Sequence, residues 1–215
     1  MEEKDTIPKY LKENNWIKEL NHKLWITKGV RFEANNRLKQ KAFLSNTSLA
    51  FISSYLIIIN LVPLFFNDLK ISSELIGFFT TALSILLLVF TQIESSNEYK
   101  LNAHFYHSCA LKISNLYNDL RIIKEIKDEK EQEKNVIEIT EEYKNILNQY
   151  ENHEPIDTDM FKSKKLDYYE LDKWFKYSTE LKFYFTVKFK YYCIIFLPPI
   201  LFTIIYFLGI SNEPI

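Results

Sequence analysis

Three stretches of the chain contain no charged residue, and they are separated by regions rich in Lys, Glu and Asp. The uncharged stretches cover residues 42–67, 75–93 and 191–212. Each reaches the ~20 residues that a helix needs to cross the ~30 Å hydrocarbon core of a bilayer. Because every Lys and Arg lies outside these stretches, the pattern predicts three transmembrane helices.

The region between the second and third stretches repeats apolar residues at helical spacing. One set is Ile113, Leu116, Leu120 and Ile123, and the other is Val136, Ile139, Tyr143, Ile146 and Tyr150. The charged segment 127–134 lies between the sets and predicts a turn or a frayed helix end. We expect an antiparallel helical hairpin whose first helix continues from the second stretch, running from Glu94 to Lys127 over about 50 Å.

The remaining segments also have helical patterns with predicted breaks. Near the N-terminus, Ile17, Leu20 and Leu24 form a short apolar stripe, Gly29 marks a possible break, and residues 30–41 can continue into the first stretch. After the hairpin, Pro155 in the loop 152–159 is expected to stop the helix. A further helix from about Leu166 should then lead into the third stretch.

Prolines make the third stretch unlike the other two. Pro198 and Pro199 lie near its middle and remove two backbone donors, which predicts a kink. The stretch can be a true span, or it can be a re-entrant or interfacial hydrophobic helix.

The fold class follows from these patterns and from the scarcity of helix breakers, with 3 Gly and 6 Pro in 215 residues. We predict an all-α integral membrane protein with a transmembrane helical hairpin, a cytoplasmic helical hairpin and a C-terminal third transmembrane helix. The predicted parts are residues 1–41 as cytoplasmic lead-in helices, 42–93 as the transmembrane hairpin, 94–190 as the cytoplasmic helical region, and 191–215 as the third transmembrane helix with a short external tail.

The distribution of basic residues predicts the orientation. Residues 1–41 hold ten Lys and Arg, residues 67–74 hold one, residues 94–190 hold sixteen, and residues 213–215 hold none. The positive-inside rule therefore places the N-terminal and central regions in the cytoplasm. The turn 67–74 and the C-terminal tail are expected outside.

Polar residues recur every seven positions inside the first two stretches. The first stripe is Asn46, Ser53 and Asn60, and the second stripe is Gly77, Ser84 and Thr91. A seven-residue repeat keeps each stripe on one helix face, and such faces avoid lipid. The stripes can pack helices together, or they can line a pore in an oligomer. Because no span contains an ionisable residue other than Tyr or Cys, an ion-coupled transporter is disfavoured.

Catalytic chemistry has little support in the sequence. His104 and His107 could share a helix face, but they lack further metal ligands of known spacing. The cluster Glu151, His153, Asp157 and Asp159 fits loop or helix-cap roles better than a metal site, and Cys109 and Cys193 fit as ordinary apolar residues. No phosphate-binding, dinucleotide or nucleophile motif is present, and no basic surface stands out. We expect no enzymatic activity, no cofactor and no direct nucleic-acid binding.

Three segments together resemble the SLATT family, the SMODS- and SLOG-associating two-transmembrane effector domains of bacterial defence systems. They are the lead-in Trp25–Ala34 with Arg37, the stretch Glu94–Tyr99, and the block Glu142–His153. In architecture the resemblance covers about residues 10–160. The third uncharged stretch departs from a two-span pattern, and it leaves open which helix would line a pore.

The resemblance implies a pore-forming or membrane-perturbing effector of the bacterial inner membrane. Such an effector would be released by an operon-encoded sensing partner, such as a nucleotidyltransferase or a reverse-transcriptase-like protein, and would cause growth arrest or death of the infected cell. Our leading hypothesis is therefore a homo-oligomeric pore lined by the first stripe and supported by Ser84 and Thr91. The alternative is a non-conducting membrane scaffold that tethers a cytoplasmic partner enzyme. A third hypothesis is a membrane-embedded enzyme that uses His104 and His107.

Overall fold

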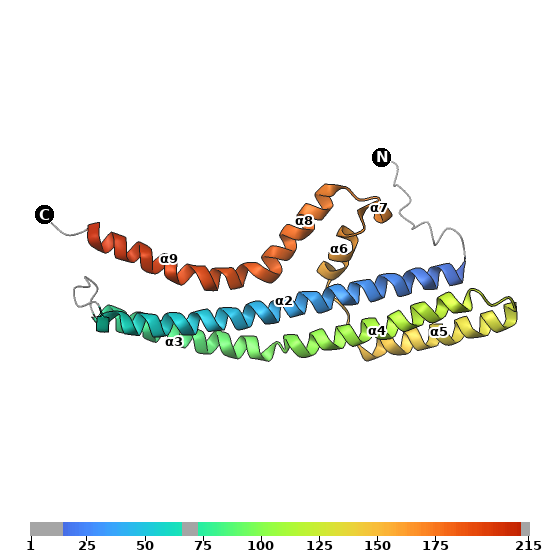
Figure 1. The fold of residues 1–215 in the computed structure, drawn as a ribbon, viewed down its shortest axis with the longest axis horizontal. Helices are drawn as coiled ribbons and strands as arrows, with labels where there is room; N and C mark the ends of the chain where they lie inside the picture. Colours follow the sequence, from blue (N-terminus) through green and yellow to red (C-terminus); the bar gives the residue numbers. More distant parts are fainter. Residues whose placement is uncertain (1–14, 66–72, 212–215) are drawn as a thin grey trace. The chain divides into compact units, whose positions relative to one another are not determined.

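The structure, a computed structural model, describes residues 15–65 and 73–211. These residues form helices and no strand, which confirms the all-α prediction for them. In chain order the elements are α2 (Trp16–Phe65), α3 (Ser73–Ser96), α4 (Tyr99–Ile123), α5 (Glu129–Gln149), α6 (Pro155–Ser163), α7 (Leu166–Tyr169), α8 (Lys173–Phe183), the π-helical turn η1 (Tyr184–Lys188) and α9 (Phe189–Ser211) (Figure 1). Residues 67–72 of the expected external turn and the tail 213–215 lie outside the described residues.

The described residues divide into two compact units. The polar unit comprises residues 15–38 and 101–180, and the apolar unit comprises residues 39–65, 73–100 and 181–211. Helix α2 contributes to both, because its residues 16–38 belong to the polar unit and its residues 39–65 to the apolar unit. These units are defined by contacts within the chain and not by the position of a bilayer. The division of the chain at a membrane boundary therefore stays a prediction.

The core of the polar unit is built from the apolar stripes that the sequence displays. Its buried members come from α2, α4 and α5: Leu20, Leu24, Cys109, Ile113, Leu116, Leu120, Val136, Ile139 and Ile146. Tyr143 and Tyr150 pack against this cluster. Helix α5 begins after Asp128, whose carboxylate accepts the backbone N–H groups of Lys130 and Glu131. The charged segment 127–134 is therefore mostly the first turn of a capped helix.

The apolar unit buries a narrow seam and exposes most of its apolar side chains. From α2 the seam includes Ser48 and Ile52, and from α9 it includes Tyr191 and Ile195. Three helices, taken over residues 16–62, 74–123 and 173–204, are long and apolar enough to cross a membrane. This finding agrees with the three predicted spans by length and composition.

The predicted continuous rod from Glu94 to Lys127 is wrong, because a break separates α3 from α4 at Asn97 and Glu98. Asn97 donates its side-chain amide to the carbonyl of Ile93 at 2.8 Å, and Ser96 donates its hydroxyl to the same carbonyl. Such local bonds compete with the helical backbone ladder. Glu98 then adopts a left-handed conformation with φ of 44°, which ends α3.

Gly29 does not break the N-terminal helix, because α2 continues through it without interruption. A Cβ atom at this position would overlap the side chain of Phe161. The glycine therefore permits close packing of an aromatic ring from α6 against α2.

The segment after α5 also differs from expectation. Helix α5 ends at Gln149, and Pro155 begins α6 rather than stopping a helix. A helix leads into the third stretch as expected, but it begins at Lys173 with α8 and continues through η1 into α9. Leu166 begins only the single turn α7, which ends where Glu170 takes a left-handed φ of 53°. Helix α9 runs through both Pro198 and Pro199.

Candidate functional site

Helix α3 exposes nearly all of its apolar surface within the single chain. None of its most hydrophobic window is buried, and its exposed residues include Phe78, Ile85, Leu86, Leu88, Val89 and Ile93. The membrane-capable part of α2 likewise exposes Ile57, Ile58, Leu61 and Leu64. A continuous apolar surface of this kind marks contact with lipid or with another protein surface.

Both polar stripes lie on exposed surface of the apolar unit. All six stripe residues are exposed: Asn46, Ser53, Asn60, Gly77, Ser84 and Thr91. The seam residues of α2 are instead Ser45, Ser48 and Ile52, which are buried. The stripes are therefore not the contacts that pack helices within one chain.

Most stripe side chains bond to the carbonyl one turn earlier on their own helix. Ser53 donates to Leu49 at 2.9 Å and Asn60 donates to Leu56 at 2.8 Å. On α3, both Ser84 and Thr91 donate at 2.7 Å, to the carbonyls of Thr80 and Leu87. These bonds use the hydroxyl hydrogens of Ser53, Ser84 and Thr91 and one of the two amide hydrogens of Asn60, and they leave the side-chain oxygens able to accept hydrogen bonds.

A hydroxyl on α2 satisfies a carbonyl that a proline leaves free on α9. Tyr55 donates its hydroxyl to the carbonyl oxygen of Ile195 at 2.7 Å. In an α-helix that carbonyl would accept the N–H of the residue four positions later, but this residue is Pro199, which has none. The bond explains how α9 tolerates this proline and links it to α2.

Glu94, which directly follows the second uncharged stretch in sequence, is a buried carboxylate. In space it lies beside the start of the third stretch. Its side chain is 2 % exposed and accepts hydrogen bonds from Lys190 Nζ and from the Tyr191 hydroxyl, both at 2.8 Å. The sequence places Glu94 at the start of the expected rod and in the family-resembling stretch Glu94–Tyr99, and it predicts no partner for this residue. The missed signal was the pair of opposite charges, Glu94 and Lys190, at the same predicted membrane boundary.

Two of the three segments that carry the family resemblance, Trp25–Ala34 and Glu142–His153, meet in the polar unit. Arg31 is fully buried, donates to the carbonyl oxygen of Glu151, and lies over the ring of Tyr106 with 5.4 Å to the centroid. The hydroxyls of Thr27 and Tyr143 are 2.8 Å apart. These contacts join the lead-in helix α2 to the end of α5, although more than 110 residues separate them in sequence.

Arg37 forms the main buried ion pair of the polar unit. Its guanidinium donates to both carboxylate oxygens of Asp157, at 2.7 and 3.0 Å, and to Glu154 at 2.6 Å. Burial alone would lower the pKa of Arg37, but the bond to Asp157 and the charges of Asp157 and Glu154 raise it above its ordinary value. Asp157 also accepts the backbone N–H of Glu154 at 3.0 Å, which gives Asp157, one member of the predicted cluster, a cap role at the start of α6.

The histidines have separate surroundings. His104 is exposed, whereas His107 is half-buried with its ring edge against Phe32. His153 Nε2 lies 3.0 Å from the hydroxyl of Thr158. Across residues 15–65 and 73–211, no three His, Cys, Asp or Glu side chains gather where they could hold a metal ion.

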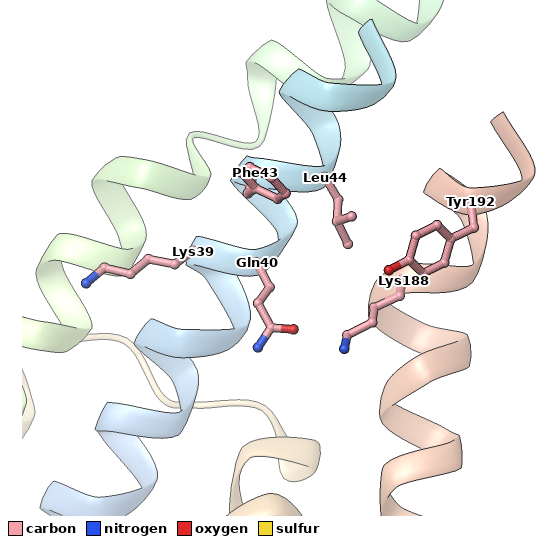
Figure 2. Close-up of a pocket in the computed structure, with 6 residues that line it drawn as sticks. All are labelled: Lys39, Gln40, Phe43, Leu44, Lys188 and Tyr192. Atoms are coloured by element: carbon pink, nitrogen blue, oxygen red, sulfur yellow. The ribbon is translucent and has the colours of Figure 1, made fainter. Parts of the chain in front are cut away.

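A hollow lies between α2 and α9 in the apolar unit. It has a volume of about 310 Å³ and is lined by Lys39, Gln40, Phe43, Leu44, Lys188 and Tyr192. In Figure 2, Gln40 and Lys188 extend into the space between the two helices, and Leu44 faces the ring of Tyr192. The ammonium end of Lys39 extends away from Lys188. The hollow thus has a polar half, with Lys188 and Gln40, and an apolar half.

Comparison with known proteins identifies one family. A family described as SMODS and SLOG-associating 2TM effector domain family 5 matches residues 13–205. The match extends beyond the 10–160 expected from the sequence and includes α8 and most of α9, so the third apolar helix lies within the matched domain. No curated protein and no solved structure matches the chain.

Proposed function

Because the chain belongs to the SMODS and SLOG-associating 2TM effector domain family 5, we propose that it is a defence effector that forms a homo-oligomeric pore in the bacterial inner membrane. A cytoplasmic sensing partner, such as an operon-encoded nucleotidyltransferase or reverse-transcriptase-like protein, would trigger the pore. The resulting loss of membrane potential would arrest or kill the infected cell.

The exposed apolar surface of α3 carries this proposal. A helix whose hydrophobic window is 0% buried within its own chain needs lipid or another copy to cover it. In an oligomer, lipid would cover the purely apolar faces, and the copies would bring the faces that carry the stripes together around the centre. Asn46, Ser53 and Asn60 would then line or gate the pore, with Ser84 and Thr91 beside them.

Outward-facing lone pairs suit the stripes to a water-filled path. Each of Ser53, Asn60, Ser84 and Thr91 already donates to its own helix, and only the second amide hydrogen of Asn60 is left over. Its oxygen remains able to accept a hydrogen bond from water or to contact a cation. Between residues 42 and 65 the helix carries no side chain that is charged at neutral pH. No fixed charge would therefore obstruct a path along this part of the helix.

The same bonds favour a second candidate, the non-conducting scaffold. A hydroxyl that bonds to its own helix is tolerated beside lipid, so the stripes need not face water. In that case the apolar unit would only anchor the chain. The polar unit, with its buried Arg31 and Arg37, would hold a partner enzyme at the membrane.

Substitution of the first stripe separates the two candidates. The test variant replaces Asn46, Ser53 and Asn60 with Leu, and the matched control replaces Thr47 with Val and Ser54 with Leu. The control positions lie on the same helix, and their hydroxyls bond to the carbonyls of Phe43 and Ala50 in the same way. Each protein is expressed in bacteria with its neighbouring genes, and the trigger is supplied by infection.

The readouts are a membrane-potential dye, the oligomer size after cross-linking, and the surviving fraction of cells. The pore proposal expects the control to depolarise the membrane like the wild type, and the test variant to assemble without depolarising it. If the triggered wild type leaves the potential unchanged while its partner remains bound, the scaffold is the better description. Equal depolarisation by wild type and test variant would remove the first stripe from the pore.

A further inference from the structure

The hollow between α2 and α9 lies at the border between charged and uncharged sequence on both helices. Lys39 and Gln40 come just before the first uncharged stretch, and Phe43 and Leu44 lie within it. On the other wall, Lys188 precedes the third stretch. If these stretches span the membrane, the hollow lies at the depth of the lipid headgroups on the cytoplasmic side.

The backbone helps to direct Lys188 and Tyr192 into this hollow. Lys188 is the last residue of the π-helical turn η1, and Tyr192 follows four residues later on the same side of α9. Opposite them, Gln40 and Leu44 are also four residues apart on α2. Each wall therefore pairs a polar side chain with an apolar one (Figure 2).

The charges around the hollow are not balanced. Lys190, two residues after Lys188, is neutralised by the buried carboxylate of Glu94. Within the part of the chain that the structure describes, neither Lys188 nor Lys39 forms an ion pair. Lys188 makes only a cation–π contact with Phe183, at 5.8 Å to the ring centroid. The unneutralised ammonium group of Lys188 beside an apolar wall is complementary to an anion that carries a hydrocarbon part. The side chain of Lys39 carries a second unneutralised ammonium group, which extends away from Lys188 in Figure 2.

We infer that this hollow binds an anionic phospholipid, and this inference rests on the proposed membrane insertion. Lys188 and Gln40 donate hydrogen bonds to the lipid phosphate, and the flexible side chain of Lys39 turns to join them. Leu44, Phe43 and the ring of Tyr192 contact the glycerol and the first acyl carbons. The lipid thereby bridges α2 and α9 at the cytoplasmic end of the apolar unit.

Lipid retention tests the site directly. Full-length protein in detergent is mixed with phosphatidylglycerol, phosphatidylcholine or inorganic phosphate, and bound molecules are counted by native mass spectrometry. The test variant is Lys39→Gln with Lys188→Gln, and the charge-matched control is Lys127→Gln with Lys130→Gln. Both control lysines are exposed and belong to the polar unit. A third variant, Lys39→Arg with Lys188→Arg, keeps the charges.

The wild type should retain phosphatidylglycerol in preference to phosphatidylcholine. One Lys→Gln change should weaken this binding about fivefold and both changes about thirtyfold, whereas the control and the Arg variant should bind like the wild type. Equal binding by wild type and test variant would overturn the inference. Binding of inorganic phosphate with displacement of the lipid would overturn it too, because the hollow would then be a free-anion site.

Carbonate extraction of cell membranes distinguishes failure of this inference from failure of the proposed function. If the wild type remains in the membrane and depolarises it, but its lysines do not affect lipid binding, only the lipid site is wrong. If carbonate releases the wild type, membrane insertion itself is wrong.

Discussion

The hydroxyl of Tyr191 donates to a carboxylate oxygen of Glu94 at 2.8 Å, and both side chains are buried in the apolar unit. The bond joins α3 to α9 near the ends of two predicted spans. Lys190 supplies the opposite charge, so the carboxylate is buried with both a cation and a neutral donor.

Removing the Tyr191 hydroxyl should destabilise the apolar unit. Tyr191→Phe leaves one carboxylate oxygen without its buried donor, and we expect a loss of about 1–3 kcal/mol. Unfolding by denaturing detergent, followed by circular dichroism, measures this loss. Tyr184→Phe serves as the control, because Tyr184 is exposed on the same helical segment. Equal losses in the two variants would contradict a specific bond to Glu94.

The Arg37–Asp157 pair should matter more than any surface ion pair of the polar unit. Asp157→Asn leaves the buried guanidinium without its buried countercharge, since the remaining partner Glu154 is exposed, and this costs about 3–5 kcal/mol. Arg37→Lys should also destabilise, since one ammonium cannot make the two-pronged contact. Thermal unfolding measures both. The comparison is Lys164→Gln, which breaks a more exposed pair with Glu33 and should cost below about 1 kcal/mol.

The bond between Tyr55 and Ile195 should depend on the proline that frees the carbonyl. Tyr55→Phe in the wild type should cost about 1–2 kcal/mol. In a Pro199→Ala background the new N–H can bond to Ile195, so the same change should cost much less. Pro198→Ala is the matched control, because it supplies an N–H to Ile194 and should leave the cost unchanged. A double-mutant cycle in detergent unfolding measures the coupling.

Gly29→Ala should destabilise the polar unit by about 1–3 kcal/mol, because the new methyl group must displace the ring of Phe161. Gly77→Ala has open space around the added atom and should be neutral or stabilising as a helix substitution. A second change, Phe161→Leu, should reduce the cost of Gly29→Ala. Thermal unfolding of the wild type, the three single variants and the Gly29→Ala, Phe161→Leu double variant measures these costs, and a neutral Gly29→Ala would refute the close contact.

Acid should weaken the polar unit through two histidines. Burial lowers the pKa of His22, and burial together with the charge of Arg31 lowers that of His153 against the opposing charge of Asp157. Each folded pKa then lies below the unfolded value of about 6.5, so protons bind preferentially to the unfolded chain. Their stabilising contribution is present above about pH 6.5 and is lost as the pH falls toward the folded values.

Thermal unfolding of the polar unit between pH 7 and pH 5 measures this effect. His153→Gln should flatten the dependence, and His104→Gln, at an exposed position on α4, should leave it unchanged. An identical slope in the wild type and in the His153 variant would assign the pH dependence to other groups.

Sequence patterns predicted the helices and their apolar faces, but they missed the local events that break or bend them. The stripes from Ile113 to Tyr150 pack as expected, because burial follows periodicity. The break at Glu98 depends on competing side-chain bonds to the carbonyl of Ile93, and no periodicity reports these. Gly29 was misread for a similar reason, since its partner Phe161 is distant in sequence.

The candidate site was only partly readable from the sequence. The stripe residues could be named because they repeat every seven positions, but contacts within a single chain do not determine what these exposed residues face. The Arg37–Asp157 pair and the Tyr55–Ile195 bond join positions 120 and 140 residues apart. Pairings at such separations depend on the packed fold, so a single sequence does not specify them.

The π-helical turn η1 contains one residue more than an α-helical turn, as the N–H of Phe189 bonds to the carbonyl of Tyr184 five residues earlier. Deleting one residue between Tyr184 and Lys188 would restore an α-helix and rotate everything beyond it by about 100°. Tyr191 and Ile195 would then point away from Glu94 and Tyr55. The extra residue thus sets the rotational phase of α9, and relatives that lack it would need a different set of partners along α2 and α3.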